Sequence, residues 1–540
     1  MDKRAVANFL IVALVFSYFF IVFDVNFRGP DEPIYFAYTA SVIEDGDLNA
    51  VNQFYKGSAK FVSQTYNLPD FHNHGGVILW APVYAYGKLF GSEKAIKCAL
   101  SLSTVIFSFF TLIFSFMLCR KLFSEKTSLL ATVIMFFATP YFYFTFFQPG
   151  NGQIIASLLS VMSIFTLYYA SAMNRLHWFL YGMFFSVCLA IKLDLWFQIF
   201  LIAMCFAALY YRKEVSPRKA LYFALGVLPV FILNLANDYI KYGIMRKGEF
   251  YLFNPHNFYF LDQLFSSYRG YFYTSPIFYI SLLGFMLVIY ALLKKRFSDN
   301  AERWKLTLLF LLSIYVLLKI FFISFRYAWG GGTTGARHLL TEFPVFVLLY
   351  AFAIENQKRL LRCVIYILSL IMVFWNLMVI SEFIKGVDIN YFVGAPELIT
   401  RFSSLGVLFD ILLQPKDIWL KLSVCLPLIA IILLLITVVM AGGAKFTAQE
   451  RVFKLMGSLA VYAFLSYGLI TLLNIGNNKR NVEALKAEGF FTGSAVLNSR
   501  DYEREENVAS MDEMIDHFTL KKDFAIVEKI KQVKKKTYGD

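Results

Sequence analysis

Charged residues are scarce in this chain. Only 16% of its 540 residues are charged, whereas 58% are hydrophobic. A soluble protein of this length would need far more charge to cover its surface. The apolar residues come in runs of about 18–25, which is the length needed to cross a bilayer. We therefore expect an all-α polytopic membrane protein, because a barrel would show short segments of alternating polarity instead.

Cysteine is also scarce. The six cysteines lie in or beside apolar runs without the spacing of a metal site, so we interpret them as small buried apolar residues. No nucleic-acid-binding signature is present either. The net charge of +14 therefore indicates anionic membrane lipid or a phosphate-bearing substrate as the partner.

The apolar runs predict about thirteen transmembrane helices. The first follows a short basic amino terminus without a small-residue cleavage site, so we expect it to be retained. The expected spans are residues 5–24, 96–119, 127–146, 152–172, 177–194, 195–211, 219–238, 274–293, 305–325, 338–354, 361–381, 417–440 and 455–474.

Loop charges predict a cytoplasmic amino terminus. Basic clusters such as Arg120–Lys121 and residues 294–296 then lie inside, as the positive-inside rule requires. Some basic residues fall outside, which makes them candidates for binding an anion. An odd number of spans places residues 475–540 outside, as a small domain or a partly disordered tail after a membrane module of residues 1–474. Repeated halves, common in transporters, are not evident.

The first outer loop, residues 25–95, opens with two adjacent carboxylates, Asp31 and Glu32. Residues 34–43 have apolar positions at helical spacing, which predicts a short helix along the membrane surface, with Pro33 in its first turn. The helix dipole would keep a carboxylate at its start ionised and able to accept a proton. The alternative is that Asp31 only caps the helix.

Two later groups in this loop are polar. Asp45 and Asp47 flank Gly46 and are typical of a solvated turn, although we also consider them for substrate binding. His72 and His74 are spaced like metal ligands, but a pair without a third ligand is weak support for a divalent metal. We expect no metal and no cofactor.

A glycine-rich segment, residues 325–338, predicts a phosphate site. Glycine lets backbone N–H groups approach an anion, and Arg326 and Arg337 can each donate two hydrogen bonds to a phosphate. The alternative is an outer turn that binds lipid headgroups without specificity. Arg269 lies similarly at the mouth of a span. A lysine at the position of Lys192 is costly unless it faces a polar cavity, pairs with Asp194 or extends to the membrane interface.

Three segments, in this order, also resemble a known family: Asp31-Glu32-Pro33-x-Tyr35 with the following Asp45-Gly46-Asp47, then Arg269-Gly270-x-Phe272-x-x-Ser275-Pro276, then Gly331-x-x-x-Gly335-x-Arg337-His338. They are similar to the bacterial polyprenyl-phosphate-dependent glycosyltransferases of the GT-C superfamily, the relatives of protein O-mannosyltransferases and of the lipid A aminoarabinose transferase. The resemblance implies a GT-C-like bundle with amphipathic helices in the first outer loop, and a small outer domain after it.

The same resemblance implies site roles. Asp31 would be the catalytic base and Glu32 a second candidate or an orienting group. The donor phosphate would be held by Arg269, Arg326, Arg337, His338 and Lys192, and the substrates would contact Tyr35, Asp45, Asp47 and His74.

The expected function is sugar transfer from a polyprenyl-phosphate donor to a lipid, glycan or protein of the envelope. The enzyme would lie in the bacterial inner membrane with its site facing outward. A lipid-linked sugar flippase or transporter, and a polysaccharide polymerase or ligase, are the alternatives.

Overall fold

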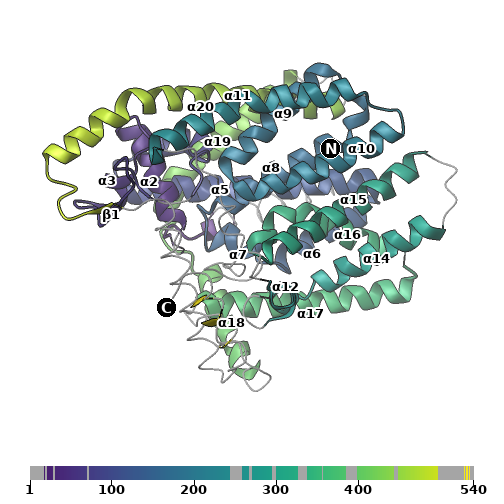
Figure 1. Cartoon of the computed structure of the whole chain (residues 1–540). Helices are drawn as coiled ribbons and strands as arrows, with labels where there is room; N and C mark the ends of the chain where they lie inside the picture. The colour runs from purple at the N-terminus through teal and green to yellow at the C-terminus, as the bar shows by residue number, and fades with distance from the viewer. Residues whose placement is uncertain are drawn as a thin grey trace.

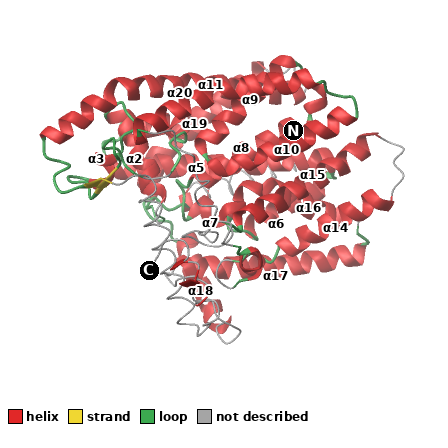
Figure 2. Cartoon of the chain, in the orientation of Figure 1, coloured by secondary structure: helices red, strands yellow, loops and turns green. Residues whose placement is uncertain are grey.

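The computed structural model of the chain is a bundle of α-helices (Figures 1 and 2). Apart from isolated positions near the two ends, it describes residues 21–27, 29, 31–69, 72–243, 258–266, 270–294, 300–325, 337–355, 357–384, 398–442 and 448–496. Strands within these ranges are limited to one short parallel pair. The all-α class predicted from composition is therefore confirmed.

Three helices and a strand come from the first loop, and they gather at one end of the bundle (Figure 1). They are α2 (Asp31–Glu44), α3 (Val51–Tyr55), β1 (Phe61–Val62) and α4 (Val77–Lys88). The elements of the bundle that follow are α5 (Glu93–Leu122), α6 (Glu125–Phe137), α7 (Tyr141–Phe146), α8 (Gly152–Tyr168), η1 (Ala170–Ala172), α9 (Arg175–Ile191), η2 (Leu193–Phe197), α10 (Gln198–Tyr211), α11 (Pro217–Tyr242), α12 (Phe260–Phe265), α13 (Tyr271–Thr274), α14 (Phe278–Lys294), α15 (Asn300–Ile323), η4 (Arg337–Glu342), α16 (Phe343–Glu355), α17 (Arg359–Ile384), α18 (Leu398–Leu413), α19 (Ile418–Gly442), α20 (Ala448–Ala487) and β2 (Ala495–Val496).

Among the described residues, seven helical segments are long and apolar enough to cross a bilayer. They are Glu93–Leu122, Asp194–Tyr211, Pro217–Tyr242, Glu302–Ile323, Arg337–Glu355, Arg359–Ile384 and Val452–Ala487. Four shorter apolar helices also overlap expected spans: Gly152–Tyr168, Arg175–Ile191, Phe278–Lys294 and Ile418–Ala430. The expected first span lies mostly outside the described residues.

The expected span at residues 127–146 is not one continuous helix, because the helix breaks within it. Helix α6 ends at Phe137 and α7 begins at Tyr141, on either side of Pro140. Proline lacks an N–H group and disfavours helical backbone in the residue before it. The side chain of Asn376 donates to the carbonyl oxygens of Phe137 and Thr139, at 2.8 and 2.9 Å, and so satisfies groups that the break exposes.

Helices α9 and α11 cross at very close range. A Cβ atom at Gly182 would lie 2.0 Å from the carbonyl oxygen of Phe223, and one at Gly226 would lie 2.0 Å from that of Phe179. Only glycine permits such an approach of two backbones. This crossing fixes the direction of α9, which carries Lys192 at its carboxyl end.

Helix α2 was expected at residues 34–43 along the membrane surface. It forms, but it starts at Asp31, and most of its residues are buried where it packs against α3, α4 and α8, whereas Pro33 and Glu44 are exposed. Its position relative to the membrane surface stays a prediction.

Helix α20 crosses the domain boundary expected at residue 474 without a break, since it runs to Ala487. Its asparagines hold the turn after α2. The side chain of Asn474 accepts from the N–H of Leu48 at 3.0 Å, and Asn477 donates to the carbonyl of Gly46 at 3.0 Å. Beyond the helix, β2 pairs with β1 of the first loop. Residues 475–496 thus pack on the first loop, while most of the remaining tail, residues 497–540, lies outside the described residues.

Candidate active site

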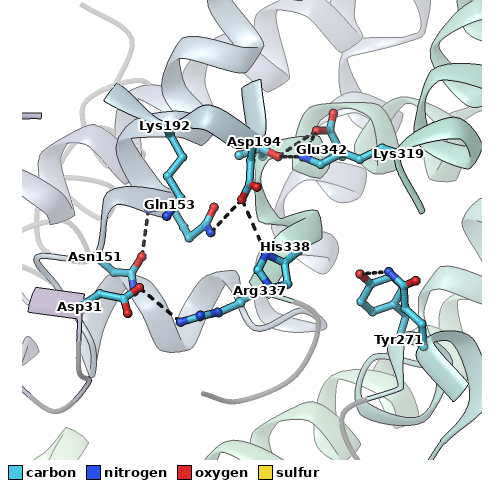
Figure 3. Close-up of polar contacts among 12 residues, drawn as sticks. Asp31, Asn151, Gln153, Lys192, Asp194, Tyr271, Lys319, Arg337, His338 and Glu342 are labelled. Carbon is cyan, nitrogen blue, oxygen red and sulfur yellow. Dashed lines mark hydrogen bonds and ion pairs between the residues drawn. The ribbon is translucent and has the colours of Figure 1, made fainter. Parts of the chain in front are cut away.

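Asp31 lies at the first position of α2, where its carboxylate is held between two groups from distant parts of the chain. Its Oδ2 atom is 3.3 Å from Nη1 of Arg337, and its Oδ1 atom is 3.5 Å from Nε2 of His72 (Figure 3 shows the arginine contact). Only 7% of the Asp31 side chain is exposed. Besides starting the helix, the Asp31 carboxylate therefore contacts charged or polar side chains from distant parts of the chain.

The surroundings of Asp31 keep it ionised. Burial alone would raise its pKa, but the charges of Arg337 and Lys192 and the hydrogen bond and charge of His72 outweigh burial. The pKa of Asp31 lies well below its usual range as a result. Its place at the start of a helix favours the negative form as well.

Glu32, the next residue, behaves in the opposite way. Its side chain is almost fully buried. Burial raises the pKa of Glu32 to about 8, and the negative charge of Asp31 adds to this effect. At neutral pH Glu32 is therefore largely protonated.

Lys192 reaches the same side of α2. Its Nζ atom donates to the hydroxyl of Tyr35 at 3.3 Å, and Tyr35 lies one helical turn after Asp31. The Tyr35 ring makes an edge contact with the ring of His72, with centroids 5.4 Å apart. The structure therefore brings together four of the residues predicted for the site: Asp31, Tyr35, Lys192 and Arg337.

The loop before α4 explains how His72 reaches this cluster. The N–H of Gly75 donates to the carbonyl of Ala190 at 3.0 Å, and the side chain of Asn73 donates to that of Leu189 at 3.1 Å. Both carbonyls belong to the last turn of α9, where helical partners are missing. A Cβ atom at Gly75 would lie 2.3 Å from the Ala190 oxygen, so only glycine fits there. This docking sets His72 beside the end of α9 that carries Lys192.

Asp194 and His338 form a second buried contact beside the first. The Nδ1 atom of His338 lies 3.6 Å from Oδ2 of Asp194, and the side-chain amide of Gln153 donates to the same oxygen at 3.3 Å (Figure 3). Since Arg337 and His338 are consecutive, one short segment contacts two buried carboxylates, Asp31 and Asp194.

The other end of η4 is held by a fully buried ion pair. Lys319 of α15 lies 2.7 Å from Oε1 of Glu342, and neither side chain is exposed. The hydroxyl of Tyr315 donates to the same oxygen at 2.8 Å. Sequence reasoning missed Gln153, Lys319 and Glu342. Lys319 did carry a signal, because a lysine inside an apolar run is costly unless it has a buried partner.

The two histidines of the first loop contact different partners. His72 faces Asp31, whereas Nε2 of His74 lies 2.7 Å from the hydroxyl of Tyr467 on α20. Among the described residues, no three His, Cys, Asp or Glu side chains are grouped so that they could hold a metal ion. His74 therefore joins the first loop to α20.

Asp45 and Asp47 lie beyond the far end of α2. A helix of this length spans about 20 Å, so the structure does not bring them to Asp31. Asp47 is buried and accepts hydrogen bonds from Ser41 at 2.6 Å and Asn481 at 2.9 Å. Burial raises its pKa. These contacts join the turn after α2 to α20. Arg269 and Arg326 lie outside the described residues.

The fold and this cluster define a class: a helical membrane protein with a buried, ionised carboxylate paired to cations. No family model matches the sequence, and no curated protein matches it. Among solved structures, the chain is similar to ArnT from Cupriavidus metallidurans bound to undecaprenyl phosphate, with a TM-score of 0.49 and 13% identity, covering 90% of this chain and 80% of that one. It is also similar to the apo state of that protein, with a TM-score of 0.45, 13% identity, and coverage of 89% and 78%.

Proposed function

We propose that this chain is an integral-membrane glycosyltransferase that moves a sugar from a polyprenyl-phosphate carrier to an acceptor in the cell envelope. The observation that carries the proposal is the buried, ionised Asp31 between Arg337 and His72, with Lys192 on the same side of α2. Transfer from a phosphate carrier needs one group to take a proton and others to stabilise a departing anion. This cluster contains both kinds of group within one buried region.

In the proposed reaction, a hydroxyl or amine of the acceptor attacks the anomeric carbon of the donor. The bond from that carbon to the phosphate oxygen breaks, and the phosphate departs with both electrons as a stable anion. The proton of the acceptor passes to Asp31. A direct displacement of this kind inverts the configuration of the anomeric carbon.

Arg337 has the features of a phosphate ligand. Its Nε atom is buried without a hydrogen-bond partner among the described residues, while its Nη1 atom contacts Asp31. A guanidinium can donate two parallel hydrogen bonds to a phosphate. Binding of the donor would then draw positive charge away from Asp31. The pKa of Asp31 would rise toward its usual range, so that the carboxylate becomes a stronger base only when the donor is present.

The other predicted contacts complete the proposal. Arg269, Arg326 and His338 would add donors around the phosphate, and the site would face the outer side of a bacterial inner membrane. This chemistry requires no cofactor, because the phosphate already is a good leaving group.

The test uses the full chain in lipid nanodiscs with a radiolabelled polyprenyl-phosphate sugar, and an envelope extract as the acceptor source. Asp31→Asn should lower the release of polyprenyl phosphate by about 10²–10⁴-fold, the usual contribution of a general base. Arg337→Lys should weaken donor binding, because an ammonium is only a point charge. Glu483→Gln, on the exposed side of α20, is the matched charge control.

Unchanged turnover in Asp31→Asn would remove Asp31 from the mechanism. Movement of labelled donor across liposomes without any acceptor would favour the flippase instead. Turnover only with a diphosphate-linked oligosaccharide would favour the polymerase or ligase.

A further inference from the structure

A large cleft lies on the opposite side of α2 from Asp31. It has a volume of about 920 Å³ and is bounded by α2, α3, α4 and the start of α5. Pro33, Phe36, Ala40 and Glu44 of α2 line it. At 3.6 residues per turn, these positions share the face directly across the helix axis from Asp31. The cleft is thus separate from the cluster described above.

One wall of the cleft is aromatic. The ring of Phe36 contacts Phe27 and Tyr84, with centroids 5.6 and 5.5 Å apart, and Phe54 stands at the rim with 37% of its surface exposed. Flat apolar rings in an open, wet cleft suit the C–H faces of sugar rings, which stack on aromatic surfaces.

The rim of the cleft is polar but electrically balanced. Its three lysines all form ion pairs with carboxylates. Lys88 pairs with Glu44 at 3.2 Å, and Lys97 and Lys56 pair with Glu93 at 2.7 and 3.7 Å. An anion or a cation would have to break these pairs. A neutral ligand rich in hydroxyl groups would not, since it can donate to the carboxylates and accept from the ammonium groups.

Gln53 supplies an unused polar atom in the same cleft. Its Nε2 atom donates to Asp45, whereas its buried Oε1 atom has no hydrogen-bond partner among the described residues. A buried acceptor without a partner is costly, and a ligand hydroxyl would satisfy it. The volume, the rings and the hydrogen-bonding groups together match a small-molecule site of ordinary size.

We infer that this cleft binds a neutral saccharide segment of the acceptor. The inference rests on the proposed function, because it assigns the acceptor of the same enzyme to the class of glycans or glycolipids. Pro33, at one end of the cleft, is two residues from Asp31. The cleft therefore includes a residue of the first turn of α2, the turn that begins with Asp31.

The experiment measures binding by saturation-transfer NMR to the full chain in nanodiscs. The probes are a linear glucose tetramer, a linear N-acetylglucosamine tetramer, inorganic phosphate and a long-chain fatty acid. At least one neutral tetramer should bind. Phe54→Ala and Gln53→Ala should each weaken that binding by about tenfold, the loss expected for one ring or one hydrogen bond. Phe265→Ala, an exposed aromatic outside the cleft, is the control and should bind as the unaltered chain does.

The inference is overturned if neither tetramer binds, if only phosphate or the fatty acid binds, or if Phe54→Ala and Gln53→Ala bind the tetramer normally. Asp31→Asn separates this result from the proposed function. Binding of a tetramer that persists in Asp31→Asn while transfer is lost supports both proposals. Binding with transfer undiminished in Asp31→Asn supports the saccharide cleft and refutes the catalytic assignment.

Discussion

Glu32→Gln should make the protein more stable, and the gain should grow with pH. Burial raises the pKa of Glu32 from an ordinary value of 4.5 to about 8. This difference of about 3.5 units corresponds to about 5 kcal/mol, at 1.36 kcal/mol for each unit. The folded chain holds the proton more tightly than the unfolded chain. The free energy of unfolding therefore falls as pH rises from about 4.5 to 8, and the full penalty is present above pH 8.

Glutamine keeps the shape of a protonated glutamate but cannot ionise. In Glu32→Gln this part of the pH dependence should disappear. The assay is thermal unfolding of the full chain in detergent between pH 5 and 9, comparing the slope of Tm against pH. Glu483→Gln removes a carboxylate that is 61% exposed and should leave the slope as it is. Equal slopes in Glu32→Gln and the unaltered chain would refute the argument that Glu32 is buried and protonated.

The same variant separates the roles of the two adjacent carboxylates. If Glu32 acts only in its neutral form, Glu32→Gln should retain sugar transfer at pH 7, whereas Asp31→Asn should lose it. Transfer by the unaltered chain should decline above about pH 8, where Glu32 ionises beside Asp31 and repels the donor phosphate. Glu32→Gln should extend activity to higher pH. Loss of transfer in Glu32→Gln at pH 7, with transfer retained in Asp31→Asn, would make Glu32 the base and reverse the assignment.

Three further predictions concern the supports of the site. Lys319→Met leaves the buried charge of Glu342 unpaired and should cost about 3–5 kcal/mol, seen as a lower Tm that a second change, Glu342→Leu, restores. Gly75→Ala should cost about 1–3 kcal/mol and slow donor turnover, because a methyl group there overlaps the backbone of α9; normal turnover would contradict this docking. Asn481→Ala removes a hydrogen bond to buried Asp47 and should lower Tm by an amount equivalent to about 1–3 kcal/mol. It should leave the affinity for the polyprenyl-phosphate sugar unchanged.

The sequence predicted those parts of the fold that depend on local pattern. Apolar runs located most of the long helices, and the spacing of residues 34–43 located α2 close to its observed bounds. Pro140 is also a local signal, since proline predicts a break in a helix. The long apolar run on both sides of it predicted one continuous helix instead. The continuation of α20 past residue 474 has a different, non-local cause. Helix α20 continues because its asparagines bind the first loop, which lies more than four hundred residues away in the chain.

The candidate site also combines residues that a local pattern predicts with contacts between distant segments that it does not predict. Asp31 could be chosen from its place before a helix, and Arg337 from its glycine-rich surroundings. Their contact, the approach of His72 and the pair of Lys319 with Glu342 join segments far apart in sequence, and only the packed helices bring these together. The contrast between Asp31 and Glu32 likewise required their burial and neighbours, since the sequence shows just two adjacent carboxylates.

The charges of the site lead to one more conclusion about the donor. Segment η4 contacts Asp31 through Arg337 and Asp194 through His338, and it pairs Glu342 with Lys319. With Lys192 included, three carboxylates face three permanent cations, while Glu32 is neutral. A phosphate group would add negative charge that this set does not compensate. Binding therefore needs further positive charge, either from protonated histidine or from Arg269 and Arg326, which the sequence predicts for this purpose. Replacing either arginine with alanine should weaken binding of the polyprenyl-phosphate sugar more than binding of the acceptor.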